Sequence, residues 1–146
     1  MTPLQFAVPI GALESVSGAL PYVILALVLA TLVTRHLAHR SYKQSARDGA
    51  DVLDRYTPHY ALTAVLVLVC LLYMVVEPHS GMVISVLVIG TFVADLFEFE
   101  SRNVEARNDL KIDRPNGAIT VSVLAVLYAG FLALFWVIKG PWEAII

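Results

Sequence analysis

The amino-acid sequence predicts an all-α protein that crosses a membrane four times. The chain of 146 residues is 58% hydrophobic and only 15% charged, which is more apolar than a globular protein of this size can bury. The apolar residues form four long, continuous runs, whereas the strands of a membrane barrel would alternate. Nine of the ten Lys and Arg residues lie between the first and second runs or between the third and fourth, and only Lys139 lies elsewhere.

Charge and cysteine content narrow the class further. Positive charge is retained on the cytoplasmic side of inserted helices, so we expect both basic stretches inside the cell and both termini outside, in the cell membrane. The net charge of −2 and the lack of a basic cluster interleaved with aromatic residues argue against nucleic-acid binding. Cys70 is the only cysteine, so no disulfide within the chain is possible.

Residues 1–18 are apolar but broken by Pro3, Pro9 and Glu14. This segment is too short to span and is expected to be interfacial or re-entrant. No positive charge precedes it, so it does not fit a cleaved signal peptide and we expect it to be retained.

The transmembrane helices are predicted at about 20–39, 60–76, 82–99 and 117–138. About 20 residues at about 1.5 Å each cover the ~30 Å hydrocarbon layer. Helix-breaking residues at 77–81 predict a tight turn between the second and third helices. The segments at about 40–59 and 100–116 are predicted to be cytoplasmic. The third helix is expected to continue past the membrane, because Glu98 and Arg102 have the spacing of a stabilising ion pair.

Small residues on the last helix recur at spacings of four, three, four and four and predict a helix-packing face. In lipid, small side chains allow backbones to approach closely. The stripe consists of Ala118, Ser122, Ala125, Ala129 and Ala133.

Asp95 is the first candidate for function, because an ionisable group inside a span is costly, at ~2.5–3.5 kcal/mol at the bilayer centre. Arg35 or His36, at the end of the first helix, should lie at a similar depth. Two interpretations remain open. The three residues form either a proton or cation coupling site or an intramembrane ion pair that fixes the third helix against the first.

The second candidate is a metal site at His36, His39, Asp95 and Glu98. Each pair has i,i+3 spacing and shares a helix face, and two imidazoles with two carboxylates could bind Zn, Fe or Mn. Against it, such sites usually place Glu and His together on one helix, and no motif of that kind occurs. No nucleophile motif or phosphate-binding loop is present either, so the sequence predicts no enzyme activity and no cofactor.

Three motifs carry a resemblance that covers most of the chain. They are the segments 34–40 (TRHLAHR), 95–100 (DLFEFE) and 104–110 (VEARNDL), the last followed by 114–118 (RPNGA). With these motifs the chain resembles a family of short four-helix membrane proteins from halophilic archaea. The resemblance implies the four-span topology and a haloarchaeal source, and it brings no catalytic residue.

Three functions are compatible with the sequence. The first is a non-catalytic membrane subunit or scaffold, whose partners are the lipid bilayer and either further copies of itself or a larger membrane complex. The alternative is a small ion- or proton-coupled transporter or channel that uses Asp95. The third is a metal-dependent membrane enzyme.

Overall fold

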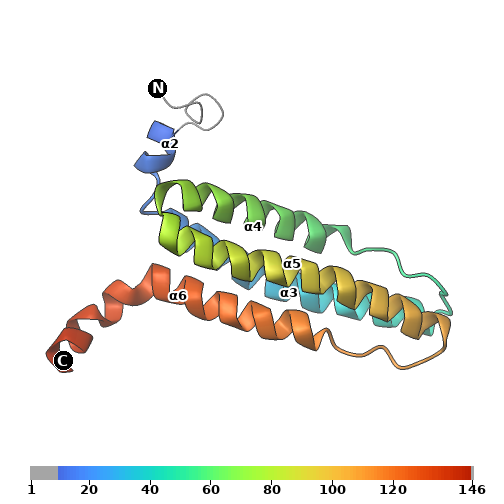
Figure 1. Ribbon diagram of the computed structural model, residues 1–146. Helices are drawn as coiled ribbons and strands as arrows, with labels where there is room; N and C mark the ends of the chain where they lie inside the picture. Colours follow the sequence, from blue (N-terminus) through green and yellow to red (C-terminus); the bar gives the residue numbers. More distant parts are fainter. Residues whose placement is uncertain (1–9, 146) are drawn as a thin grey trace.

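The computed structural model describes residues 10–145, which form five helices and no strand. The first helix is a short one and the other four are long (Figure 1). In chain order they are α2 (Ile10–Ser15), α3 (Leu20–Arg47), α4 (Thr57–Val76), α5 (Pro78–Arg107) and α6 (Asn116–Ile145). The prediction for residues 1–18 falls partly on residues 1–9, which lie outside the described part.

The four long helices lie side by side as an up-and-down bundle (Figure 1). α3 contacts α4 and α6, and α5 contacts the same two helices from the other side. The connections 48–56 and 108–115 lie together at one end, which we call the connection end (Figure 1). The turn between α4 and α5 lies at the opposite end, which we call the turn end, together with α2 and the end of α6.

Proline and residues with positive φ mark the helix boundaries. Pro21, Pro58 and Pro78 lie in the first turns of their helices, where a missing N–H leaves no hydrogen bond unmade. After α3 and α5 the chain turns through Gly49 and Asp109, which have φ values of 86° and 53°. Such left-handed residues commonly follow the last helical turn, because they allow the N–H groups beyond it to satisfy its carbonyls.

All four long helices are long and apolar enough to cross a membrane. α3, α5 and α6 continue beyond the spans predicted from the sequence. Charged residues mark the end of the membrane-spanning segment of a helix, but the helix itself can continue beyond them. In α5 the extension is supported by Arg102, which pairs with Glu98 at 3.5 Å and with Glu105 at 2.9 Å. These i,i+4 and i,i+3 pairs stabilise a helix in water.

The interior of the bundle contains two apolar clusters. The larger one occupies the turn end and includes Ile24, Ile84 and Cys70, all of which are fully buried. The smaller one occupies the connection end and includes Tyr42 and Phe99, whose rings are 5.4 Å apart. The segments of α3, α4, α5 and α6 between these clusters contribute buried polar side chains.

The end of α6 diverges from the other helices (Figure 1). Trp136 is the last of its residues to form a hydrogen bond with another long helix, through Nε1, which donates to the Tyr22 hydroxyl at 2.6 Å. Beyond it, Val137, Ile138 and Trp142 are all exposed. This final section therefore offers apolar surface to lipid or to another protein.

Candidate functional site

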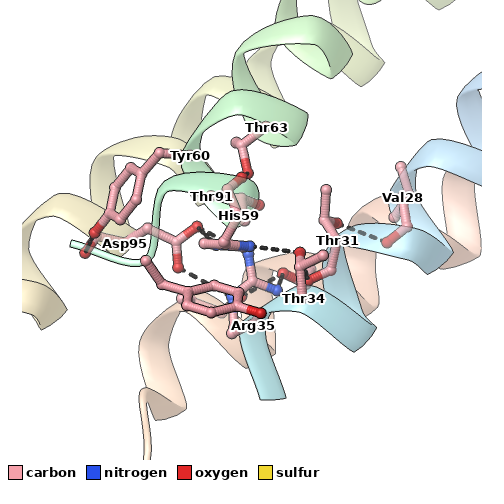
Figure 2. A network of polar contacts seen from close by, with 12 residues as sticks. Val28, Thr31, Thr34, Arg35, His59, Tyr60, Thr63, Thr91 and Asp95 are labelled. Carbon is pink, nitrogen blue, oxygen red and sulfur yellow. Dashed lines mark hydrogen bonds and ion pairs between the residues drawn. The ribbon is translucent and has the colours of Figure 1, made fainter. Parts of the chain in front are cut away.

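A buried ion pair between α3 and α5 forms the centre of the candidate site (Figure 2). Arg35 Nε donates to Asp95 Oδ1 at 3.0 Å, and Arg35 Nη2 donates to Asp95 Oδ2 at 2.9 Å. The two side chains are only 5% and 6% exposed. Parallel double hydrogen bonds of this kind are among the strongest that a carboxylate forms, and they also fix its orientation.

His59 brings α4 into the same site. Its Nε2 lies 2.9 Å from Asp95 Oδ2, and its Nδ1 lies 2.8 Å from the Thr34 hydroxyl (Figure 2). The side chain is 3% exposed. Both ring nitrogens therefore have partners, and Asp95 Oδ2 is shared between the guanidinium of Arg35 and the imidazole.

Ser122 connects the fourth helix. Arg35 Nη1 donates to Ser122 Oγ at 2.6 Å, and this hydroxyl in turn donates to the Ala118 carbonyl at 2.7 Å. One hydrogen-bonded cluster thus includes a side chain from each of α3, α4, α5 and α6. We call this cluster the polar layer, and its members are Thr34, Arg35, His59, Asp95 and Ser122.

Three buried threonines lie next to the polar layer, and each donates its hydroxyl proton back to its own helix. Thr31 bonds the Val28 carbonyl at 2.6 Å, Thr63 bonds the His59 carbonyl at 2.8 Å, and Thr91 bonds the Leu87 carbonyl at 2.9 Å. Hydroxyls that bond to the preceding helical turn are satisfied without a partner on another helix. These threonines therefore add buried polar groups next to the polar layer and need no hydrogen-bond partner on another helix.

Two small cavities flank the polar layer. A cavity of about 20 Å³ lies on the connection side, lined among others by Asp95, His59 and His39. A second of about 10 Å³ lies on the turn side and is lined by Arg35, Ser122 and threonine side chains. A polar cavity of about 10–15 Å³ holds one water molecule. The space beside Asp95 is therefore the size of about one water molecule.

The structure brings some of the predicted residues together and separates others. Arg35 and Asp95 form the ion pair, whereas His36 is exposed on the surface of α3 and His39 is half-buried. Glu98 accepts a hydrogen bond from the Gly117 amide at 3.2 Å, in addition to its pairing with Arg102. Of Arg35 and His36, it is therefore Arg35 that contacts Asp95.

The predicted metal site is not assembled. Within residues 10–145 no group of three or more His, Cys, Asp or Glu side chains could hold a metal ion. The reason is visible in the geometry, since the carboxylate of Asp95 faces Arg35 and His59 instead of His36 and His39. His39 lines the same small cavity as Asp95 and Glu98, but His36 is exposed on the surface of α3, so the four predicted ligands do not come together.

His59 is the functional candidate that sequence reasoning missed. It follows Pro58, and this pair resembled the end of a connection, so the second span was predicted to begin at residue 60. α4 in fact begins at Thr57, which places His59 inside the bundle. Because Pro favours the first turn of a helix, the proline was a signal that His59 could already be helical.

The predicted packing face of α6 coincides with its buried surface. The buried residues of this helix are Ala118, Ser122, Ala125, Ala129 and Ala133. Four of them bring α6 close to its neighbours through small side chains. Ser122 also provides the hydrogen-bond partner of Arg35.

The fold and the site define a multi-pass helical membrane protein with a buried polar layer that joins its four spanning helices. The chain belongs to the family described as Domain of unknown function (DUF7313), whose model matches residues 2–146. No curated protein and no solved structure matches the chain.

Proposed function

We propose that this protein is a non-catalytic subunit or scaffold of the cell membrane, which assembles with itself or with a larger membrane complex. The observation that carries the proposal is the polar layer. Arg35 donates to Asp95 and Ser122, and His59 contacts the same carboxylate, so one cluster links all four spanning helices. A cluster that holds all four helices together favours a rigid bundle, which presents a fixed surface to its partners.

A transporter, the alternative class of protein, needs helices that move against one another. Transport by alternating access moves one group of helices against another around the binding site. Separating α3 from α5 would break two charge-assisted hydrogen bonds between Arg35 and Asp95 in a buried setting, and an unpaired buried charge is strongly unfavourable. The turn side of the layer is also filled by large apolar side chains, including Ile24 and Ile84. These features favour a scaffold over an alternating-access transporter.

The final section of α6 supports assembly with a partner in the membrane. Val137, Ile138 and Trp142 are exposed on a helix that diverges from its own bundle (Figure 1). In lipid, helices associate through close packing, and this section, whose side chains are not buried by the described part of the chain, has surface free for that purpose. The partner is a second copy of the chain or another membrane protein.

The proposed orientation has the connection end in the cytoplasm and both termini outside, because the connection end carries the basic residues. Asn108→Cys tests the orientation, since Asn108 is exposed at this end whereas the native Cys70 is buried. We expect an impermeant thiol reagent to label the variant in opened but not in intact cells. Labelling in intact cells would reverse the orientation. The haloarchaeal source stays a prediction of the sequence.

The main experiment is purification of the full chain at native abundance from its own cells in mild detergent, followed by quantitative mass spectrometry. The proposal predicts a stoichiometric membrane partner or a homo-oligomer of defined mass. The variant Val137→Ser/Ile138→Ser makes the exposed surface of α6 polar and should weaken the association. The control is Val52→Ser, which changes an exposed apolar residue at the opposite end and should leave the association unchanged. Recovery of the chain as a lone monomer would contradict the proposal.

A second function, a proton-coupled transporter or channel, is favoured by one specific observation. His59 lies 2.9 Å from Asp95 beside a cavity the size of about one water molecule, which is the arrangement that a proton site would need. This function predicts pH-driven flux in reconstituted vesicles that Asp95→Asn abolishes without unfolding the protein. Asp48→Asn, at an exposed carboxylate, is the control. No flux by the unmodified protein, or full flux by Asp95→Asn, would exclude it.

A further inference from the structure

A basic groove lies at the connection end between α3 and the beginning of α6, with a volume of about 450 Å³. Five of the side chains that line it are histidine, arginine or lysine, in addition to the buried Arg35, and no carboxylate lines it. We call this set the basic groove, and its residues are His36, His39, Arg40, Lys43 and Arg114. Four come from α3, and Arg114 comes from the connection before α6.

The cations of the basic groove differ from the two buried arginines of the bundle. Arg35 is neutralised by Asp95, and Arg102 is neutralised by Glu98 and Glu105. By contrast, Arg40 and Arg114 form no ion pair with any carboxylate of the described chain, and neither does Lys43, the third cation of the groove. His36, Arg40 and Lys43 recur at spacings of four and three, which aligns them on one face of α3. The groove therefore concentrates positive charge that the described chain does not balance.

The depth of the groove matches the boundary of a bilayer. About 20 helical residues cover the ~30 Å hydrocarbon layer, and α3 begins at Leu20, so its residues near position 39 reach the headgroup region. Leu32 and Ile119 line the groove on the side of the hydrocarbon. The groove is thus apolar toward the membrane interior and basic toward the headgroups.

We propose that the basic groove binds the headgroup of an anionic phospholipid. The phosphate oxygens accept hydrogen bonds from Arg40, Arg114 and Lys43, and these donors form charge-assisted bonds with phosphate. An acyl chain lies along Leu32 and Ile119. Basic pockets between membrane helices recognise anionic headgroups through this combination of charge and depth. The apolar side of the groove selects a lipid over a free phosphate, which would gain nothing from Leu32 and Ile119.

The test is native mass spectrometry of the full chain in detergent, titrated with phosphatidylglycerol or with phosphatidylcholine. We expect preferential binding of phosphatidylglycerol. The groove variant is Arg40→Gln/Arg114→Gln, which removes two exposed cations. Each cation near a membrane surface contributes enough for about a fivefold change in binding, so the pair should lower the affinity for phosphatidylglycerol about 30-fold. Arg40→Lys/Arg114→Lys retains the charge and should recover most of the affinity.

The matched control is Arg107→Gln/Lys111→Gln. It removes the same net charge at the same end of the bundle, from two exposed residues that do not line the basic groove. It should change the affinity for phosphatidylglycerol less than about threefold. Circular dichroism checks that each variant is folded, and if the double groove variant does not fold, Arg114→Gln alone should lower the affinity about fivefold.

Three results would overturn the proposal. The first is equal binding of the two lipids by the unmodified protein. The second is an equal loss of affinity in the groove and control variants, which would indicate attraction to net charge alone. The third is displacement of phosphatidylglycerol by glycerol phosphate at a similar concentration, with the same dependence on Arg40 and Arg114. That result would assign the groove to a soluble phosphate compound instead of a lipid.

Discussion

Removal of one partner of the Arg35–Asp95 pair should destabilise the bundle far more than removal of both. Arg35→Met takes away both hydrogen bonds to the carboxylate and leaves Asp95, 6% exposed, with only His59 as a side-chain partner. Breaking a buried pair in this way costs about 3–5 kcal/mol, because a buried charge remains uncompensated. Ser122 adds little to this figure, since its hydroxyl keeps its bond to the Ala118 carbonyl.

The double variant Arg35→Met/Asp95→Leu removes both charges and fills the space with apolar groups. Such replacements are neutral or stabilising by about 1–4 kcal/mol in other buried pairs. Asp95→Leu alone should cost about as much as Arg35→Met, because Arg35 then keeps only Ser122. Two single losses of about 3 kcal/mol or more and a neutral double variant give a coupling free energy of at least about 6 kcal/mol for the double-mutant cycle.

The assay is reversible unfolding in mixed micelles with increasing dodecyl sulfate, followed by circular dichroism. The control cycle uses Arg55→Gln and Glu100→Gln, a pair at 3.9 Å whose side chains are 49% and 67% exposed. An exposed pair contributes at most about 1 kcal/mol. If Arg35→Met lowered the free energy of unfolding by no more than the control substitutions, the polar layer would not be the joint that holds the helices together.

Three further substitutions and one control substitution test the packing of the bundle by the same unfolding assay. Gly81→Ala should lower the free energy of unfolding by at least about 1–3 kcal/mol, because a Cβ at Gly81 would overlap the backbone of α4. Gly90→Ala is the control and should be tolerated, because the nearest atom would be 3.7 Å from its Cβ. Equal effects of the two substitutions would contradict the close approach of α5 to α4 at Gly81. Thr34→Val should lower the free energy of unfolding by about 1–3 kcal/mol, because it leaves Nδ1 of the buried His59 without its partner at 2.8 Å. An unchanged unfolding midpoint would show that this contact is dispensable. Ala129→Leu should cost about 1–3 kcal/mol, because Ala129 is fully buried and a larger side chain would push α6 away from the bundle; no loss of stability would refute this tight contact of α6.

The spans could be predicted from the sequence because hydrophobic length has a direct physical meaning in a bilayer. A run such as 60–76 must find either lipid or a large core, and a chain of this size has no large core. The helix ends could not be placed in the same way. α3 continues to Arg47 and α5 to Arg107, because helix formation in water depends on local pairs and caps instead of hydrophobicity.

The candidate site could be predicted in part. Asp95 was singled out because of the cost of a carboxylate inside a span, and Arg35 followed as a cation at similar depth. The choice between Arg35 and His36 depends on which face of α3 meets α5, and this rotation is set by packing of the whole bundle. His59 lay outside the prediction for another reason, since a histidine next to a proline has the same local pattern in a connection as in the first turn of a helix.

The sequence separations within the polar layer impose an order on its assembly during synthesis. Asp95 lies 60 residues after Arg35, and Ser122 lies 87 residues after it. At about 5–20 residues per second, the guanidinium of Arg35 waits several seconds before its counter-ion leaves the ribosome. Thr34 and His59 are only 25 residues apart, so α3 and α4 can pair first as a hairpin. The insertion machinery must therefore keep this hairpin hydrated at Arg35 until α5 arrives, and the completed bundle closes only when its third and fourth helices have entered.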